Sequence, residues 1–221
     1  MSTAARGSIP VTVTLEHSTM MNFRTLHRGD AAIFQALRLD ALRESPEAFG
    51  STYEEDVHLP LEVVADRIEE STVAPHRVVF GAYDGEALVG FVGCMQSPKI
   101  KSRHTATIWG TYVHPTVRGR GIGIALLSRL IAHASGWEDV QRLTLTVVER
   151  AHAARALYRA AGFELFGREP DGLRQDGVSD TVEYMALHLL SSPRRRRWRD
   201  GGDGGSSGRA ARRGDSRRRS R

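Results

Sequence analysis

The stretch VRGRGIGIALL, residues 117–127, holds the residues of this chain whose types and spacing most directly predict chemistry. Its glycines occupy alternate positions directly ahead of an apolar run at helical spacing: Gly119, Gly121 and Gly123. Glycines at a helix start leave backbone N–H groups open to close approach, and the helix dipole adds positive charge there. The loop therefore predicts a cradle for a phosphate or diphosphate, with charge from Arg118 and Arg120. The alternative is a glycine-containing turn with solvated arginines.

Two familiar phosphate-binding loops do not fit this stretch. The P-loop pattern ends in Gly-Lys-Ser/Thr, and the chain contains no such triplet. The dinucleotide fingerprint is G-x-G-x-x-G after the first strand of a βαβ unit, whereas this chain has G-x-G-x-G late in its sequence. We set both aside.

Hydrophobic spacing predicts the elements that position the loop. A strand in residues 21–30 leads to Asp30, a suitable N-cap for a helix that stops before Ser45-Pro46. The apolar stripe of this helix comprises Ile33, Phe34, Leu37, Ala41 and Leu42. A second amphipathic segment follows, with apolar positions at Leu61, Val64, Ala65 and Ile68.

The strongest hairpin signal comes from residues 77–83 and 86–96, with Asp84-Gly85 as the turn pair. A third β-rich run, TATIWGTYV, ends at His114-Pro115, because proline cannot continue a sheet interior. The helix after the glycine loop carries on one face Leu126, Leu127, Leu130, Ile131 and Ala134.

The last elements are a buried strand in residues 142–148, a short helix in 151–163 that Gly162 ends, and strands in 164–167 and 181–189. The predicted order is β α α β β β α β α β β. Such an order indicates one mixed α/β domain rather than a strict alternation of strands and helices.

Charge is unevenly distributed along the 221 residues. Residues 191–221 contain 12 arginines and 3 aspartates, a charge of +9, so residues 1–190 carry −4 when the total is +5. This tail has one aromatic residue, Trp198, and no aliphatic residue larger than alanine, so its composition predicts disorder. We expect a flexible leader in residues 1–19, a folded domain in 20–190 and a disordered tail in 191–221.

The single cysteine, Cys94, excludes an internal disulfide framework and a cysteine-based zinc cluster, and we expect no metal. Because it lies in the apolar run ALVGFVGCM, we interpret it as a buried, inert thiol. No stretch approaches the roughly 18 apolar residues of a membrane span, and no signal peptide is evident. These observations predict a cytoplasmic protein without a membrane partner.

The second half of the chain resembles the GNAT superfamily of acetyl-CoA-dependent N-acetyltransferases. The loop pattern Q/R-x-x-G-x-G/A of that superfamily is matched by Arg118, Gly121 and Gly123. The pattern A-x-x-L-Y followed by G-F is matched by Ala154, Leu157, Tyr158, Gly162 and Phe163. The segment SPEAFGSTYEED further resembles one bacterial subgroup.

The resemblance covers residues 21–190 and implies a fold. That fold is a mixed, mostly antiparallel, twisted sheet of about six to seven strands, flanked by about four helices, with splayed central strands. The strand before the glycine loop would bulge, and the pantetheine arm of acetyl-CoA would insert beside it.

The resemblance also implies site residues. Backbone groups of Tyr112 and Val113 would pair with pantetheine, and the phenol of Tyr158 would donate a hydrogen bond or proton to the leaving thiolate. The diphosphate would be wrapped by Arg118, Gly119, Arg120, Gly121, Ile122 and Gly123. Family members often have asparagine where this chain has Ala151, so an amide near the pantetheine arm is missing. The helix alone favours a core aromatic at Tyr158, and the neighbouring phosphate loop shifts the interpretation toward a catalytic role.

Acetyl transfer requires a neutral amine. Neutralising a lysine-like amine at pH 7 costs about 4.6 kcal/mol, whereas an α-amine costs only about 1–1.4 kcal/mol. Many family members place a glutamate on the splayed strand, but TATIWGTYVHP contains no carboxylate. The candidate bases are Glu54, Glu55, His114 and water held by Thr111. The two glutamates could instead be a solvated helix start and His114 an exposed strand end.

Trp109 and Tyr112 could shape the acceptor pocket or simply pack in the sheet. The sequence does not identify the amine acceptor, which could be a small molecule or a protein amine, and it leaves a homodimer open.

A different interpretation is a protein that binds nucleic acid or an anionic surface through its arginine tail. The tail lacks repeated aromatic residues for base stacking. A third possibility is a fold of this kind that binds acyl-CoA without catalysis.

Overall fold

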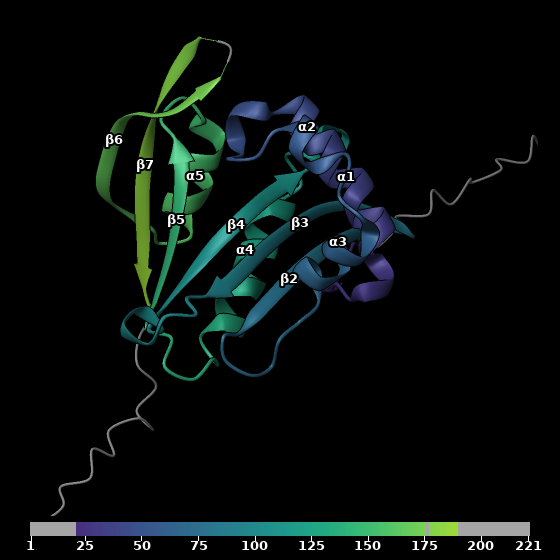
Figure 1. Cartoon of the computed structure of the whole chain (residues 1–221), viewed down its shortest axis with the longest axis horizontal. Helices are drawn as coiled ribbons and strands as arrows, with labels where there is room; N and C mark the ends of the chain where they lie inside the picture. The colour runs from purple at the N-terminus through teal and green to yellow at the C-terminus, as the bar shows by residue number, and fades with distance from the viewer. Residues whose placement is uncertain (1–20, 176, 190–221) are drawn as a thin grey trace, which may run out of the picture. The chain divides into compact units, whose positions relative to one another are not determined.

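A seven-stranded sheet, in the order β1-β2-β3-β4-β5-β7-β6, organises the fold. The computed structural model describes residues 21–175 and 177–189. Every neighbouring pair of strands is antiparallel except β4 and β5, which run parallel (Figure 1). The strands are β1 (Asn22–Thr25), β2 (Arg77–Asp84), β3 (Ala87–Gln96), β4 (Thr105–Val113), β5 (Arg142–Val148), β6 (Glu164–Gln175) and β7 (Val178–His188).

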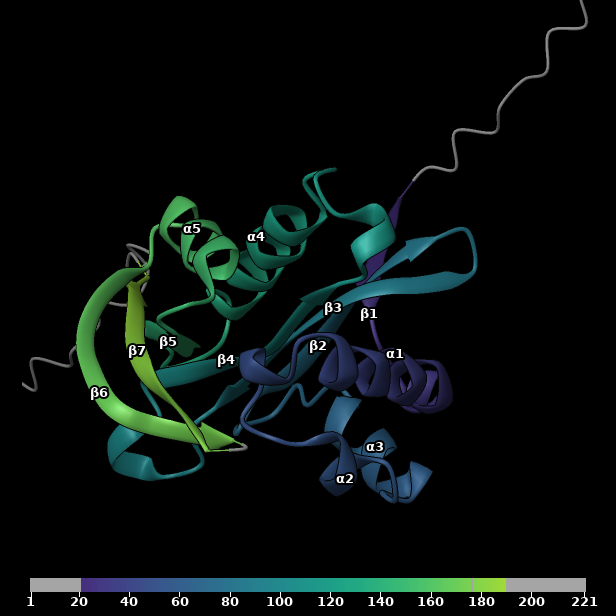
Figure 2. The ribbon, with the colours of Figure 1, turned by 90° about the horizontal axis from the view of Figure 1, so that it is seen from above.

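Helices cover both faces of the sheet. Figure 2 shows α4 and α5 on one face and α1, α2 and α3 on the other. Their bounds are α1 (Ala31–Glu44), α2 (Tyr53–Asp56), α3 (Leu61–Ile68), α4 (Ile122–Ala134) and α5 (His152–Ala160). Four single 3-10 turns complete the description: η1 (Arg28–Asp30), η2 (Pro46–Ala48), η3 (Ile100–Ser102) and η4 (Pro115–Val117). The predicted mixed sheet and element order are confirmed, and α2 is a short addition to them.

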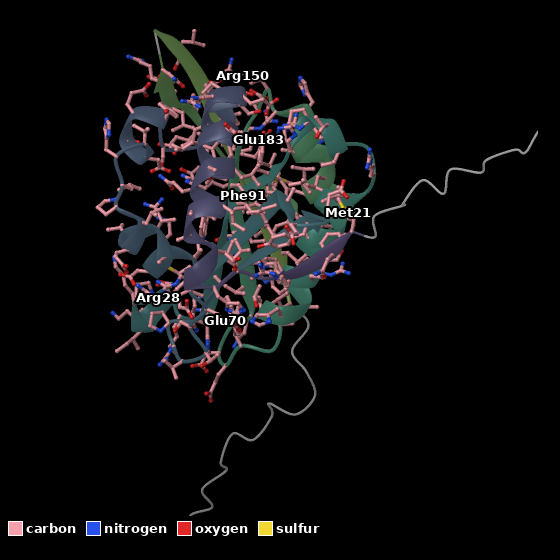
Figure 3. All side chains as sticks on the ribbon, turned by 90° about the vertical axis from the view of Figure 1, so that its right-hand side faces the viewer. Met21, Arg28, Glu70, Phe91, Arg150 and Glu183 are labelled. Carbon is pink, nitrogen blue, oxygen red and sulfur yellow. The ribbon has the colours of Figure 1, made fainter. Side chains whose placement is uncertain are left out.

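Two apolar cores lie on opposite faces of the sheet, because successive side chains of a strand point to opposite sides. Val78 and Val92 pack in the core with α4, whereas their neighbours Val79 and Phe91 pack in the core with α1 and α3. Figure 3 shows Phe91 near the centre, with Arg28 and Glu70 toward one end. Cys94 is fully buried, and burial raises the pKa of its thiol, so the expected inert cysteine is confirmed.

The central strands splay apart. Pairing between β4 and β5 is limited to three register positions, Thr105–Arg142, Ala106–Leu143 and Thr107–Thr144. Beyond Thr107 the two strands diverge, as Figure 1 shows. A bulge then interrupts β4, since the register with β3 shifts between Phe91 and Gly93. Gly110 lies in this bulge with φ of 63°, a left-handed conformation that glycine adopts without strain.

The hairpin between β2 and β3 turns one residue later than predicted. Asp84 pairs with Ala87, so the two-residue loop is Gly85-Glu86 rather than Asp84-Gly85. Gly85 has φ of 62°, and glycine in the first of two loop positions is typical of a type II′ turn. The prediction of the hairpin is therefore right and its turn pair is wrong.

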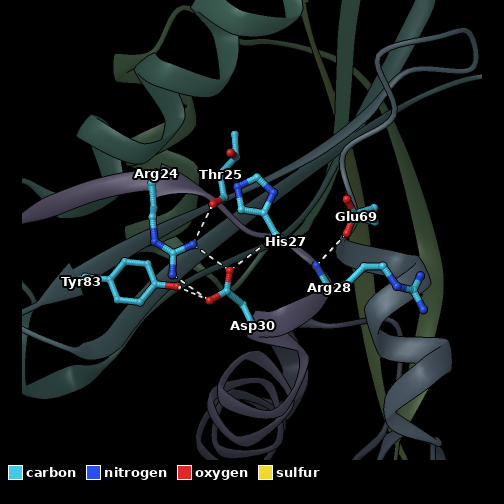
Figure 4. Close-up of polar contacts among 7 residues, drawn as sticks. All are labelled: Arg24, Thr25, His27, Arg28, Asp30, Glu69 and Tyr83. Atoms are coloured by element: carbon cyan, nitrogen blue, oxygen red, sulfur yellow. Dashed lines mark hydrogen bonds and ion pairs between the residues drawn. The ribbon is translucent and has the colours of Figure 1, made fainter.

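Asp30 is the N-cap residue of α1 by position, but its side chain forms no cap hydrogen bond to that helix. Its carboxylate instead accepts two hydrogen bonds of 2.7 Å from Arg24 and one of 2.9 Å from the backbone N–H of His27 (Figure 4). The Tyr83 hydroxyl lies 3.3 Å away and also donates to it. This carboxylate thus ties β1 to β2 and to the turn before α1.

Replacing Asp30 with asparagine should destabilise the fold by about 1 kcal/mol at pH 7. Hydrogen bonds from Arg24 are the first cause that lowers the pKa of Asp30 from 3.8 to about 2. Such a shift corresponds to at most roughly 2.5 kcal/mol, and solvent screening reduces it because Arg24 is 40% exposed. A lowered carboxyl pKa gives stability that is present above about pH 4 and is lost as the pH falls toward 2.

Urea unfolding of the parent protein and of Asp30→Asn, at several pH values between 7 and 3, measures this loss of stability. The difference in unfolding free energy should shrink as the pH falls. A difference that stays constant over this range would show that the charge of Asp30 is not its origin.

Residues 1–20, 176 and 190–221 lie outside the described residues, so the predicted leader in 1–19 and the predicted arginine tail in 191–221 are entirely outside them. Within residues 21–175 and 177–189, no helix is long and apolar enough to cross a membrane.

Candidate functional site

The glycine loop after β4 presents a row of open backbone donors. Gly119 and Gly121 have φ of 78° and 76°, and a side chain at either position would meet no atom within 4 Å. α4 begins at Ile122, and its first backbone bond to the cap is donated by Ala125 to Gly121. In the described part of the chain, no backbone N–H from Gly119 to Ile124 donates a hydrogen bond. Six consecutive N–H groups at a helix start are a site for an anion.

The third glycine of the loop has a packing role. A side chain on Gly123 would contact Leu157 of α5 at 3.3 Å, tighter than an ordinary contact. Gly123 therefore lets α4 approach α5 closely, whereas Gly119 and Gly121 allow the backbone of the loop to turn.

The two arginines of the loop differ. Arg118 donates to both carboxylate oxygens of Glu44 at 3.1 and 2.7 Å and to the carbonyl of Val113 at 2.8 Å. These bonds from Arg118 lower the pKa of Glu44, and the ion pair joins the loop to the end of α1. Arg120 is exposed and forms no hydrogen bond or ion pair within the part of the chain that the structure describes. Of the two loop arginines, Arg120 is therefore the one whose charge is available to a ligand.

A cavity of about 660 Å³ extends from this loop into the gap beside β4. Tyr112, Val113 and the loop line one side of it, and the start of α5 lines the other. A second cavity of about 500 Å³ lies further along β4 and reaches α1, α3 and the segment between α1 and α2. The two cavities share Ala48, Thr111, Ala151, Ala154 and Tyr158. The shared residues mark the point where ligands in the two cavities would meet.

Tyr158 lies at this junction on α5. Arg155, one turn earlier on the helix, donates to both carboxylate oxygens of the fully buried Glu183 at 2.7 and 3.0 Å. Arg155 also donates to the carbonyl of Glu149 at 2.9 Å, so α5 is attached to β7 and to the end of β5. Figure 3 shows Glu183 and Arg150 at this end of the fold. This attachment fixes the position of Tyr158.

Tyr158 is also a core aromatic, 7% exposed and in edge contact with Phe163. Burial raises the pKa of its phenol, and the neighbouring Thr111 hydroxyl works against that rise. A raised pKa keeps the phenol protonated at neutral pH, which is the state that can donate a proton. Thr111 Oγ1 is buried and has no hydrogen-bond partner of normal geometry among the described residues. Packing and chemistry are thus compatible roles for Tyr158.

The structure does not bring the predicted bases to this junction. Glu54 and Glu55 are exposed at the start of α2, and neither lines the 660 Å³ or the 500 Å³ cavity. Glu55 accepts from the backbone N–H of Thr52 at 2.9 Å in a capping box, which is a structural role. The Nδ1 atom of His114 lies 2.8 Å from the Thr116 hydroxyl at the start of η4. The geometry thus fits the alternative of a solvated helix start.

The two aromatic residues predicted near the acceptor lie in different places. Trp109 lines the 500 Å³ cavity and packs across Gly93, where any side chain would clash with its ring. Tyr112 lines the 660 Å³ cavity, and its ring lies in the core with Phe91.

Sequence reasoning missed three arginines, Arg38, Arg67 and Arg77, that line the 500 Å³ cavity. Arg38 lies on the buried face of α1, and its Nε donates to the buried Asp56 at 2.5 Å. A signal for it was present, because Arg38 falls in helical register with Phe34 and Ala41 inside an apolar stripe. Arg67 and Arg77 have no comparable signal.

Comparison with known families identifies the chain. The model of the Acetyltransferase (GNAT) family matches residues 36–163, more than half of the sequence. The chain belongs to the GNAT family. The resemblance seen in the glycine loop and in α5 is therefore confirmed.

Relatives of this GNAT chain include the L-2,4-diaminobutyric acid acetyltransferase of Shouchella clausii (strain KSM-K16), which is 35% identical over 78 residues. That match covers 35% of this chain and 42% of the relative, so the chain spans less than half of its length.

Solved structures share the fold. An acetyltransferase of the GNAT family from Streptococcus pneumoniae has a TM-score of 0.68 and 22% identity, covering 77% of this chain and all of its own. A GNAT superfamily phosphinothricin acetyltransferase from Sinorhizobium meliloti, in complex with acetyl-CoA, has a TM-score of 0.64 and 20% identity. That match covers 79% of this chain and 91% of the other.

This GNAT chain departs from the family pattern at Ala151, the N-cap residue of α5. Ala151 makes no side-chain cap bond, and it lines both cavities. In the described residues, the backbone N–H groups of Ala153 and Ala154 donate no hydrogen bond. An asparagine at position 151 would reach these groups, so its absence leaves them open toward the cavities.

Proposed function

We propose that this GNAT chain transfers the acetyl group of acetyl-CoA to an amine. One observation carries the proposal: the loop whose six N–H groups donate no hydrogen bond in the described residues lines a cavity that continues beside β4 to Tyr158. The thioester of acetyl-CoA supplies an activated acetyl group when it is bound.

The residues present suit a diphosphate followed by an amide-containing arm. Gly119, Gly121 and Ile122 contribute N–H groups, as do Arg120 and Gly123, and the exposed Arg120 adds positive charge. The backbone of β4 beyond Thr107 lacks a strand partner on the side of β5, where Tyr112 and Val113 line the cavity. Arg118 is bound to Glu44, so we assign it to holding the loop against α1.

Tyr158 holds a proton where the two cavities meet, and we propose that it protonates the leaving sulfur. The amine enters from the 500 Å³ cavity. None of the residues that line that cavity is an aspartate, glutamate or histidine. Its arginines lower the pKa of a bound ammonium by charge repulsion, which favours the neutral, nucleophilic amine. This charge reduces the need for a general base.

Isothermal titration of the full chain with acetyl-CoA and with CoA tests the first half of the proposal. We expect both to bind, and we expect free thiol release only when an amine acceptor is present. Absence of heat with both ligands would overturn the assignment. Binding without transfer to any amine of a broad panel would instead indicate an acyl-CoA-binding protein.

We further propose that residues 20–190 carry the activity and that the arginine tail is dispensable for it. A chain ended after Leu190 should keep kcat/KM within about twofold of the full chain, because both cavities lie before that residue. Loss of transfer on truncation would assign the tail a part in the reaction. We also propose a cytoplasmic location, where a reduced cysteine such as Cys94 is usual.

A further inference from the structure

The acceptor-side cavity carries an unusual charge. Its lining residues include Arg38, Arg67 and Arg77 but no lysine, histidine or carboxylate residue. Among the described residues, Asp56 is the only carboxylate that forms an ion pair with any of the three arginines. Asp56 thus pairs with Arg38 and Arg67, and Arg77 has no carboxylate partner among the described residues.

Arg38 is the most constrained of the three. Its side chain is 6% exposed, and only its Nε is used, in the bond to Asp56. In the described residues, neither of its terminal nitrogens donates a hydrogen bond. One of them lies 3.7 Å from where a side chain on Gly110 would begin, so it faces the bulge of β4. A buried guanidinium with free donors at a cavity wall is suited to an anion.

The other two arginines extend the same positive surface. Arg67 lies 3.6 Å from Asp56 and is 35% exposed. Arg77 donates from Nε to the backbone carbonyl of Glu69 at 3.0 Å, which leaves its charge unpaired within the described part. Burial lowers the pKa of Arg38, Asp56 opposes this, and the nearby charge of Arg67 lowers it further. The guanidinium groups of Arg38 and Arg67 are thus close enough to repel each other.

We infer that the acceptor is a small amine that also bears an anionic group, and that Arg38, Arg67 and Arg77 bind this group. The inference rests on the proposed acetyl transfer and names its substrate class. The amine would lie at Thr111 and Tyr158, and the anion at the opposite wall of the cavity, whose 500 Å³ suits a small molecule. A carboxylate and a phosphonate both have the required chemistry.

A cationic acceptor is the principal rival. A smaller cavity of about 190 Å³ adjoins the 500 Å³ cavity. Its lining includes Glu47 and Glu169, so it would suit a second ammonium group. A polyamine would use that cavity and avoid the arginines. The two classes are therefore separated by the charge of the group distant from the reacting amine.

Matched pairs of amines test the inference on the full chain with saturating acetyl-CoA. The pairs are 2,4-diaminobutyrate with 1,3-diaminopropane, lysine with cadaverine, and 2-aminoethylphosphonate with ethanolamine. We expect kcat/KM to be at least about tenfold higher for the anion-bearing member of at least one pair. The first two pairs report on carboxylates and the third on phosphonates. Equal or better use of the uncharged or cationic member in every pair would overturn the inference.

Variants then locate the anion site. Arg67→Gln and Arg77→Gln should each lower the preference for the anionic member to about threefold or less, mainly by raising the KM of that member. Arg103→Gln is the matched control, because Arg103 pairs with Asp139 outside the cavity. The dissociation constant of acetyl-CoA should not change in any of the three. A preference that survives both cavity variants would overturn the assignment of these arginines.

A binding measurement separates this inference from the proposed function. If acetyl-CoA binds but no amine is acetylated, titration of the CoA-bound protein with the same pairs decides the charge preference. Heat with anionic members alone supports the inference, whereas equal heat with both members, or none with either, overturns it. Failure of acetyl-CoA itself to bind is the separate result that contradicts the proposed function.

Discussion

Replacing Gly121 with aspartate is expected to weaken acetyl-CoA binding at least 100-fold while the fold stays intact. Gly121 has φ of 76° and ψ of 7°, a left-handed conformation that aspartate and asparagine tolerate better than other side chains. A side chain there would meet no atom within 4 Å, so the structural cost of the substitution is the left-handed backbone conformation alone. The new carboxylate would lie beside the six open N–H groups and repel a diphosphate.

Gly121→Asn is the matched control for charge, because it has the same shape without the negative charge. We expect at most about a tenfold loss of affinity for asparagine, measured by titration calorimetry. Thermal unfolding should show melting temperatures within a few degrees of the parent for both variants. Equal losses for aspartate and asparagine would show that shape, and not charge at the helix start, determines binding.

Replacing Tyr158 with phenylalanine is expected to lower kcat at least tenfold, and by up to about 10⁴-fold, with little change in acetyl-CoA affinity. The ring packs against Phe163 and is 7% exposed, and phenylalanine preserves that packing. Only the hydroxyl at the junction of the two cavities is lost. The phenol is protonated at neutral pH and burial raises its pKa further, so its loss removes a proton donor at the point where the thiolate would leave.

Steady-state kinetics with saturating acetyl-CoA measure the effect on kcat, and direct titration with acetyl-CoA measures the effect on its affinity. Tyr53→Phe is the control, since the Tyr53 hydroxyl bonds to Arg43 outside both cavities. Unchanged turnover in Tyr158→Phe would remove this residue from the mechanism. A loss of acetyl-CoA affinity as large as the loss of kcat would instead indicate that Tyr158 acts in binding.

Much of the site follows from local sequence, because its parts are local. The donors between Gly119 and Ile124 are backbone groups that a short glycine pattern and a helix start produce together. The C-terminal glycine of α5, Gly162, has φ of 91° as expected for a residue that ends a helix. The apolar stripe of α4 is buried as predicted at Leu126, Leu127, Leu130 and Ala134.

Other features depend on contacts that no local pattern encodes. Ile33 and Leu61 were assigned to apolar stripes but are 42% and 51% exposed, since the sheet contacts the neighbouring positions. The extension of β6 to Gln175 also escaped prediction, because this exposed edge strand is largely polar and contains Pro170. Periodicity identifies a strand that buries at least one face, and it fails for a strand such as β6 whose two faces are both largely exposed.

The charge of the acceptor cavity is the clearest case of information absent from the sequence pattern. Arg38 comes from α1, Arg67 from the end of α3 and Arg77 from the start of β2. Their meeting depends on how α1 and α3 cross the sheet, which spacing alone does not determine. The candidate bases Glu54 and Glu55 are adjacent in sequence, and the structure places both outside the two cavities.

The short pairing between β4 and β5 creates a sheet edge in the interior of the fold rather than at its rim. The outer edge strands of a sheet can pair with strands of other molecules. The unpaired edge of β4 instead lies across a gap from β5, and the bulge at Gly110 bends it. A ligand that completes it needs peptide-like amides in an extended form and a width close to that of one chain. We therefore expect the acyl donor to occupy this edge as an additional strand, so that the free energy of unfolding rises with the logarithm of the donor concentration once that concentration exceeds the dissociation constant.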